Sequence, residues 1–474
     1  MVDRPAFTGP DLCAYEAHEV VGLLKRGEVS PSELLDASIK RCAEVEPDIN
    51  AMPIVCEARA RQALKSVPNN SLLSGLPIAI KDLMAVGGVK TTYGTKGLAD
   101  NVPAISEPLV EVLEGNGAIV VGKTNVPELG AGGNTFNDVF GSTANPWNTS
   151  RNAGGSSGGA AAALATGEVW LAHGSDYGGS LRTPAAYCGV VSLRPTPGRA
   201  GGGGVLTAWN TEGVQGPMAR SVTDCALFLD AMVGFDAGSP ISIDKQPDES
   251  FLRAAGTPPE NLRIAYSPDL GGHGLVSTDV SKVLEDALGI VEKNGATIEE
   301  VALQTATLNA TFRTLRGLAF LTQYKCMPDS VRDHLKPTII ENVAFGRNLT
   351  IDQIADAQIN KNIIYSNINV VLSNYDVIAC PVVGLAAGPL HEEYPAEVEG
   401  QPLGDYLDWL RFSNLSTVTG LPSVSLPVGF IPDGMPMGIQ LIGSNRGESK
   451  LLAVARAIEQ MLALKNTPID PVTP

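Results

Sequence analysis

Cysteine and histidine are scarce in this chain of 474 residues, which holds seven cysteines and five histidines. The cysteines stand far apart, with no C-x-x-C pair and no cysteine–histidine spacing typical of zinc, at positions 13, 42, 56, 188, 225, 326 and 380. Their odd number also argues against a disulfide framework. We therefore expect neither a metal site nor any other cofactor.

Long apolar runs and excess positive charge are lacking as well. No stretch of about 18 apolar residues could span a bilayer, and the N-terminus lacks the basic-then-apolar layout of a secretory signal. The 34 Lys and Arg residues face 51 Asp and Glu residues, and the net charge of −17 repels phosphate backbones and anionic lipids. The sequence predicts a cytoplasmic protein that binds neither nucleic acid nor membranes.

Hydrophobic patterning predicts an α/β fold. Ser30, Pro31 and Glu33 form a capping box that starts a helix, which we expect to end near Glu46 because Pro47 follows. A strand over 76–80, a helix over 109–114 and a strand over 118–121 then follow in β-α-β order. The same reasoning predicts helices over 160–166, 278–294, 352–372 and 448–465, and strands over 168–173, 377–383 and 422–428.

Residues 117–124 match the phosphate-loop pattern G-x-x-x-x-G-K-[ST] letter for letter. The loop interior is Ile-Val-Val, however, which favours a strand over a flexible phosphate cradle. We expect a core strand that ends in a turn. A nucleotide-dependent enzyme that uses Lys123 stays an alternative.

Residues 155–159 match G-x-S-x-G, the nucleophile elbow of α/β-hydrolases, with Ser157 as the nucleophile. An elbow follows a buried strand, whereas residues 145–152 are polar and turn-like. No downstream histidine has a neighbourhood that indicates catalysis; the candidates are His173, His273, His334 and His391. An α/β-hydrolase-type esterase that uses Ser157 stays a second alternative.

The scarcity of histidine makes lysine the next candidate for a general base, provided that burial lowers its pKa. Lys81 ends the apolar strand, and two glycine-rich segments with serines follow at 154–159 and 174–182. Ser180 comes after two glycines in a turn that leaves a strand, where backbone N–H groups can converge as an oxyanion hole. This combination indicates acyl transfer.

At these segments the chain resembles the amidase signature family. The resemblance rests on GGSSGG at 154–159, DYGGSLR at 176–182 followed by Pro-Ala, and IAIKD at 78–82, and it continues to residue 443. It implies a single large α/β/α domain with a central mixed, mostly parallel β-sheet flanked by helices. Residues 1–60 would be N-terminal helices that pack on the core, and residues 61–474 would form the catalytic domain.

The resemblance also implies roles for individual residues. Ser180 would be the nucleophile, Ser156 a bridging serine preceded by a cis peptide bond, and Lys81 the base. The oxyanion hole would consist of the N–H groups of Tyr177, Gly178, Gly179 and Ser180. The residues that orient the lysine and the loop would be Ser157, Asp176 and Arg182. Gly130 and Tyr177 would lie beside the substrate.

The implied reaction is hydrolysis of a carboxamide by a monomer or homodimer, on a small aryl or alkyl amide, with ester or carbamate cleavage at the same site. A glutaminase subunit of an amidotransferase complex is the alternative within the family. Such subunits usually carry Gln where this chain has Thr183. We expect the segments 308–343 and 391–412 to line the substrate pocket, and the glycine run 201–204 to form a loop.

Overall fold

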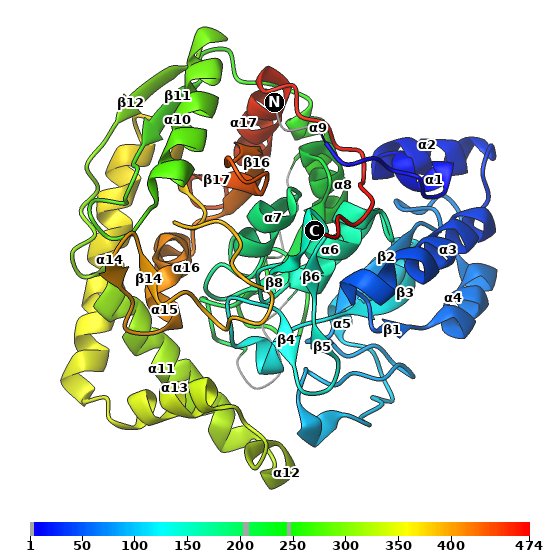
Figure 1. Cartoon of the computed structure of the whole chain (residues 1–474), viewed down its shortest axis with the longest axis horizontal. Coiled ribbons are helices and arrows are strands. Elements are labelled where there is room, and N and C mark those ends of the chain that lie inside the picture. The colour runs from blue at the N-terminus through cyan, green and yellow to red at the C-terminus, as the bar shows by residue number, and fades with distance from the viewer. Residues whose placement is uncertain (1–3, 202–207, 244–247) are drawn as a thin grey trace.

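The computed structural model describes residues 4–201, 208–243 and 248–474, so most of the glycine run at 201–204 lies outside the described residues. A mixed sheet of eleven strands forms the centre (Figure 1). From edge to edge the strands are β1 (Ile54–Val55), β3 (Ile119–Thr124), β2 (Pro77–Lys81), β8 (Leu171–Asp176), β10 (Val214–Ala219), β9 (Val191–Arg194), β16 (Ser423–Phe430), β17 (Pro436–Ile442), β13 (Val377–Pro381), β11 (Arg263–Tyr266) and β12 (Thr297–Glu300).

The α/β class and the mixed sheet are confirmed, but the parallel majority is not. Four of the ten neighbouring strand pairs are parallel and six are antiparallel. Apart from β1 with β3, the antiparallel pairs lie in the middle of the sheet, where β10, β16 and β17 each run antiparallel to both of their neighbours. Three small two-stranded ribbons lie outside it: β4 (Phe136–Asn137) with β5 (Gly141–Ser142), β6 (Ala144–Asn145) with β7 (Asn148–Asn152), and β14 (Glu397–Val398) with β15 (Gln401–Pro402).

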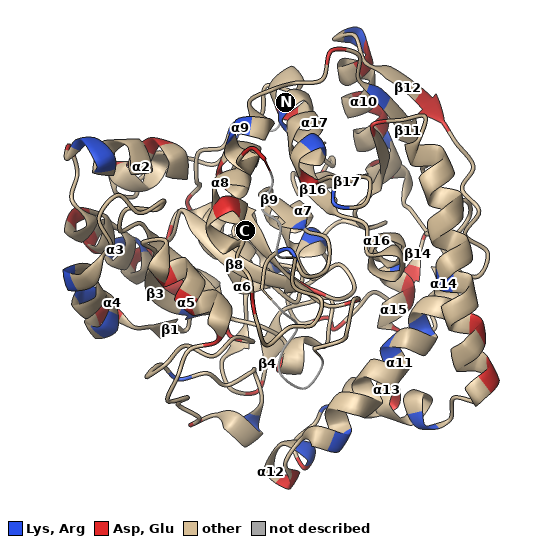
Figure 2. Cartoon of the chain, turned by 180° about the vertical axis from the view of Figure 1, so that it is seen from behind, with Lys and Arg blue, Asp and Glu red and all other residues tan. Residues whose placement is uncertain are grey.

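Helices cover both faces of the sheet. Neighbouring strand residues point to opposite faces, so Leu171 joins the core beneath α8 while Ala172 joins the core beneath α6. The helices are α1 (Asp11–Ala14), α2 (Ala17–Arg26), α3 (Pro31–Ile49), α4 (Glu57–Ala63), α5 (Pro108–Gly115), α6 (Gly158–Thr166), α7 (Arg182–Cys188), α8 (Val222–Met232), α9 (Phe251–Ala255), α10 (Thr278–Lys293), α11 (Leu308–Cys326), α12 (Asp329–Arg332), α13 (Pro337–Arg347), α14 (Ile351–Leu372), α15 (Tyr406–Trp409), α16 (Asn414–Thr419) and α17 (Glu448–Met461). Positions of Lys and Arg and of Asp and Glu are both spread along the outer helices (Figure 2). None of the helices in the described ranges is long and apolar enough to cross a bilayer.

Helix α3 begins as expected but ends later than expected. Ser30 and Glu33 form the predicted capping box, yet the helix continues through Pro47 to Ile49. The proline removes one backbone hydrogen bond close to the end of the helix. The buried side chains of Val45 and Ile49 hold the last turn against the core, so packing outweighs that loss.

Strand β8 lies three residues further along the chain than predicted, and this shift positions the site. It pairs antiparallel with β10 through Asp176 and parallel with β2, where Ile78 lies opposite Leu171. Because β2 and β8 run in the same direction, their carboxyl ends meet at one edge of the sheet. Lys81 and Asp176 are the last residues of these two strands.

The phosphate-loop match is the buried strand β3, as expected, and the nucleotide-binding alternative is wrong. Lys123 is fully buried, and its Nζ donates to Asp82 Oδ1 at 2.7 Å and to Thr91 Oγ1 at 2.9 Å. Its ammonium group is therefore paired inside the protein and is not available to a phosphate.

Removing this pair should destabilise the fold strongly. Lys123→Met leaves the Asp82 carboxylate buried without its cation, and we expect the free energy of unfolding to fall by about 3–5 kcal/mol. Lys90→Met is the matched control because Lys90 pairs with the exposed Asp100, and it should cost less than about 1 kcal/mol. Urea unfolding of both variants measures the difference, and equal losses would contradict the interpretation.

Candidate active site

Lys81 is the centre of a buried hydrogen-bond cluster. Its Nζ lies 2.8 Å from Ser156 Oγ, 2.7 Å from Ser157 Oγ and 3.2 Å from the carbonyl oxygen of Ser175. A neutral amine has two N–H donors and one lone pair. It can therefore donate to Ser157 and Ser175 while it accepts the hydroxyl proton of Ser156.

The environment of Lys81 favours this neutral form. Burial lowers the pKa of Lys81 to about 7, although the nearby Asp176 carboxylate opposes the shift. A large share of the lysine is then unprotonated at neutral pH. A lysine with such a pKa can act as a general base.

The glycines around Ser156 leave no room for larger residues. The Gly155–Ser156 peptide bond is cis, as the resemblance implied. A Cβ atom on Gly155 would come within 3.0 Å of backbone atoms of Asn134, and one on Gly158 would lie 2.3 Å from Thr135 Oγ1. Thr135 Oγ1 donates to the carbonyl of Gly154 and accepts from the N–H of Gly158, which fixes the loop.

Ser180 lies in the turn after β8, with 8% of its surface exposed. Its carbonyl oxygen accepts a hydrogen bond from Ser157 N at 3.1 Å, which ties the two serine segments together. Its hydroxyl makes no hydrogen bond to any residue that the structure describes. The structure therefore joins Lys81 to Ser156 but does not join Ser156 to Ser180.

The expected oxyanion hole needs one correction. The N–H of Gly179 donates to Asp176 Oδ1 and that of Leu181 to Asp176 Oδ2, both at 3.0 Å. Gly179 is thus occupied inside the turn and cannot bind a substrate oxygen. The N–H groups of Tyr177, Gly178 and Ser180 have no hydrogen-bond partner within the described ranges, and they remain as candidate donors.

Asp176 is held by two buried arginines. Arg182 donates from Nε and Nη2, and Arg194 donates from Nη1 at 3.0 Å. Burial alone would raise the pKa of the Asp176 carboxyl, but the two guanidinium groups bring it well below its usual range. Asp176 and Arg182 were expected here. Arg194 was missed, and its signal in the sequence was an arginine directly after the strand-like run Val-Val-Ser-Leu at 190–193.

Gly130 lies close to Ser156, while its expected place beside the substrate stays a prediction. Its φ of +71° is in the left-handed region that favours glycine. A Cβ atom there would lie 2.7 Å from Leu83 Cδ1 and 3.5 Å from Ser156 Oγ. A larger residue would therefore clash with the Leu83 side chain and would touch the Ser156 hydroxyl.

The elbow alternative with Ser157 as nucleophile is wrong. Ser157 is fully buried, and its hydroxyl accepts from Lys81 and donates to the carbonyl of Ser175. His173, in β8, accepts from the backbone N–H of Lys81 at Nδ1 and contacts Gln215 through Nε2. Both ring nitrogens are thus occupied, and burial lowers the pKa of His173 to about 3, so the imidazole is too weak a base to take a serine proton.

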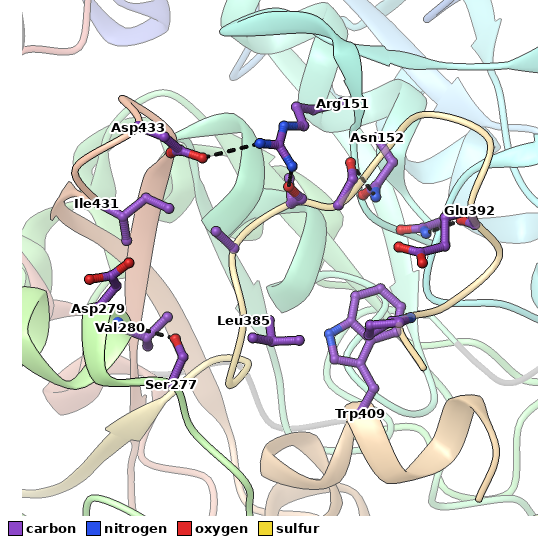
Figure 3. A pocket seen from close by; sticks show the side chains of 15 residues that line it. Arg151, Asn152, Ser277, Asp279, Val280, Leu385, Glu392, Trp409, Ile431 and Asp433 are labelled. Carbon is purple, nitrogen blue, oxygen red and sulfur yellow. Dashed lines mark hydrogen bonds and ion pairs between the residues drawn. The ribbon is translucent and has the colours of Figure 1, made fainter. Parts of the chain in front are cut away.

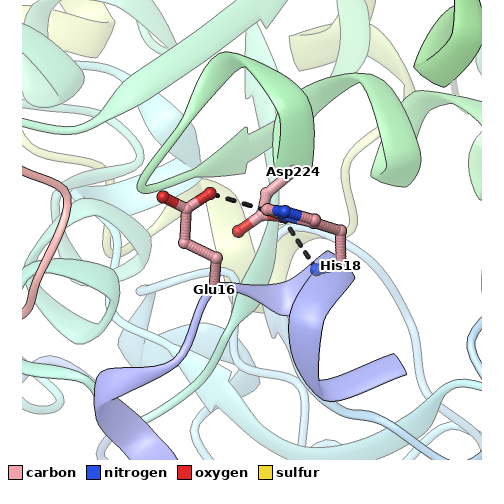
Figure 4. A group of neighbouring side chains, drawn as sticks. All are labelled: Glu16, His18 and Asp224. Atoms are coloured by element: carbon pink, nitrogen blue, oxygen red, sulfur yellow. Dashed lines mark hydrogen bonds and ion pairs between the residues drawn. The ribbon is translucent and has the colours of Figure 1, made fainter. Parts of the chain in front are cut away.

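A cavity and a second group of polar side chains lie apart from the cluster around Lys81. A cavity of about 240 Å³ is lined by residues such as Arg151, Glu392 and Trp409, and it does not include Lys81, Ser156 or Ser180 (Figure 3). Glu16, His18 and Asp224 also converge (Figure 4). Asp224 accepts the backbone N–H groups of Ala17 and His18 at the start of α2, which accounts for that cluster structurally.

The pH dependence of turnover tests the role of Lys81. Because the base must be neutral, kcat/KM for an uncharged substrate should fall as the pH drops below about 7. Lys81→Ala should lose about 10²–10⁴-fold in rate. His173→Asn should keep the acid limb near pH 7, and a rate that stays flat to about pH 5 would contradict a lysine base.

Comparisons with known proteins match most of the chain. A family model described as Amidase matches residues 33–452. The chain is similar to an acylamidase of Rhodococcus erythropolis, with 35% identity over 94% of each chain. It is also similar to a glutamyl-tRNA(Gln) amidotransferase subunit of Halothermothrix orenii, with 33% identity over 94% of this chain and 97% of the relative.

Solved structures with the same fold include an enzyme of the amidase signature family. A bacterial aryl acylamidase of the amidase signature family superposes with a TM-score of 0.88 at 25% identity, over 94% of this chain and 96% of that chain. The family match covers most of the sequence, and the fold agrees over nearly the whole length. The chain therefore belongs to the amidase family, the amidase signature enzymes, and is an amidohydrolase that acts on carbon–nitrogen bonds.

Proposed function

We propose that this amidase forms an acyl-enzyme on Ser180 and that Ser156 relays the Ser180 proton to a neutral Lys81. The observation that carries the proposal is the 2.8 Å contact between Lys81 Nζ and Ser156 Oγ in a site where burial lowers the pKa of the lysine to about 7. A lysine in this state can accept a proton from a hydroxyl that it touches.

In the proposed reaction the substrate carbonyl oxygen points to the N–H groups of Tyr177, Gly178 and Ser180. Ser180 Oγ turns toward Ser156 and attacks the carbonyl carbon, while its proton moves to Ser156 Oγ and the Ser156 proton moves to Lys81 Nζ. The three N–H groups stabilise the oxyanion, and each such donor typically contributes about 10²–10³ in rate.

The tetrahedral intermediate then breaks its carbon–nitrogen bond. The leaving nitrogen takes a proton back through Ser156 from Lys81 and departs as an amine or ammonia. Water attacks the acyl-enzyme by the same relay, which releases the carboxylic acid and restores Ser180.

We propose small aryl or alkyl amides as substrates, with esters and carbamates cleaved at the same site. The names of the relatives, acylamidase and aryl acylamidase, support this class. The ring of Tyr177 meets that of Phe312 edge-on at 6.3 Å, so an aromatic wall borders the proposed oxyanion hole. We propose that the segments 308–343 and 391–412 complete the pocket.

A second candidate is the glutaminase subunit of an amidotransferase complex. The similarity to the glutamyl-tRNA(Gln) amidotransferase of Halothermothrix orenii supports it, whereas Thr183 replaces the usual glutamine. Ammonia release from glutamine, compared with release of aniline from acetanilide, separates the two candidates. We expect the anilide to react at least about tenfold faster in kcat/KM, and the reverse order would favour the glutaminase.

A shared acyl-enzyme makes a sharper prediction for the proposed mechanism. With hydroxylamine present, an anilide and an ester of the same acid should give the same ratio of hydroxamate to acid, because both pass through one acyl-Ser180 intermediate. Ser180→Ala should abolish both products. Ser192→Ala is the control, since it removes a buried hydroxyl that has no hydrogen-bond partner. Ratios that differ between the two substrates would contradict a common intermediate.

A further inference from the structure

Arg316 is a buried arginine without a carboxylate partner. It lies on α11 with 5% of its surface exposed. Its Nε donates to Asn342 Oδ1 at 3.2 Å, and its Nη2 donates to the hydroxyl of Tyr406. No carboxylate in the described part of the chain pairs with it, and its Nη1 has no hydrogen-bond partner there.

Most of the other buried arginines in the described ranges have a carboxylate partner, and the one without has carbonyl partners for its guanidinium. Arg182 and Arg194 pair with Asp176, and Arg41 pairs with Asp470. Arg220 donates instead to several backbone carbonyls. A buried cation without a counter-charge is costly. This contrast points to a counter-charge that a bound molecule supplies.

Aromatic rings surround the Arg316 guanidinium and fix its position. Its Cζ lies 4.4 Å from the ring centre of Phe320 and 5.5 Å from those of Tyr177 and Tyr406. Such rings stabilise the cation and keep its planar fork oriented. The hydroxyl of Tyr177 is also buried and has no hydrogen-bond partner. Two unused donors therefore lie on neighbouring side chains.

This pair of donors adjoins the proposed oxyanion hole. Tyr177 directly follows Asp176 in the turn that carries Ser180, and a Cβ on the next residue, Gly178, would lie 3.2 Å from Phe312 Cζ. Phe312 and Arg316 are four residues apart on α11, so their side chains lie on the same side of the helix. The contact of Phe312 therefore places Arg316 close to the loop that holds Ser180. The bond from Arg316 to Tyr406 joins the two segments expected to line the pocket.

We propose that Arg316 and the Tyr177 hydroxyl bind a carboxylate at the far end of the substrate's acyl group, so that the enzyme prefers mono-amides of dicarboxylic acids. A guanidinium and a phenol are both donors, which suits a carboxylate with its two acceptor oxygens. The leaving nitrogen must face Ser156 to receive its proton. The acyl group, on the opposite side of the carbonyl, is then directed toward Tyr177. This inference rests on the proposed acyl-enzyme at Ser180.

Matched substrates test the proposal on the full-length enzyme. The mono-4-nitroanilide of glutaric acid carries a carboxylate, whereas the 4-nitroanilide of its half-amide has the same shape without the charge. We expect the wild type to prefer the charged anilide by at least about tenfold in kcat/KM, as a charge-assisted hydrogen bond would give. Arg316→Met should reduce this preference to about one, and Arg316→Lys should restore part of it.

Arg263→Met is the control variant, because Arg263, on β11, pairs with Glu299 and lies outside the segments proposed to line the pocket. It should leave the preference at its wild-type value. If Arg316→Met does not fold, inhibition of the wild type decides: glutarate should inhibit at least about tenfold more strongly than its neutral diamide.

Equal kcat/KM values for the two anilides in the wild type, or a preference that survives Arg316→Met, would overturn the proposal. Failure of the underlying mechanism gives a different result. Hydrolysis of the neutral anilide that does not depend on Ser180 would refute the acyl-enzyme itself. Hydrolysis that depends on Ser180, without a preference for the carboxylate, would refute only the role of Arg316.

Discussion

The rest of the site depends on one constraint: the buried amine of Lys81, at the end of β2, must be neutral to accept a proton. Burial shifts the pKa of Lys81 to about 7, and this shift gives the amine a free lone pair near neutrality. The nearby Asp176 carboxylate opposes this shift, because a negative charge favours the protonated amine. Arg182 and Arg194 bind that carboxylate on its other sides. The two arginines thus allow Asp176 to organise the Ser180 turn while Lys81 still loses its proton near neutral pH.

Close backbone packing is the other constraint. Ser156 reaches Lys81 only because the loop that carries it lies against Asn134 and Thr135, where no Cβ would fit on Gly155 or Gly158. Helix α6 continues this loop with four consecutive buried alanines, 160–163, beneath the sheet. The segment is therefore rich in glycine, serine and alanine for two reasons: larger side chains would not fit, and the serines are needed for the proposed chemistry.

The sequence predicted those features that local patterns encode. Lys81, Ser156 and Ser180 stand in short motifs, and the strand-end placement of Lys81 followed from the apolar run before it. Features that depend on distant segments were missed. The sheet has fewer parallel pairs than expected because strand order is a long-range property. The commitment of the Gly179 N–H to Asp176, and the surroundings of Arg194 and Arg316, depend on side chains that meet only in the fold.

The central claim is that Ser180 is the nucleophile of a site whose base is Lys81. Labelling with a fluorophosphonate, followed by peptide mass mapping of the modified serine, tests it most directly. The account predicts one label, on Ser180, with little label when Lys81 is replaced by alanine. A label on Ser157 or Ser156, or labelling of Ser180 that proceeds equally well without Lys81, would contradict it.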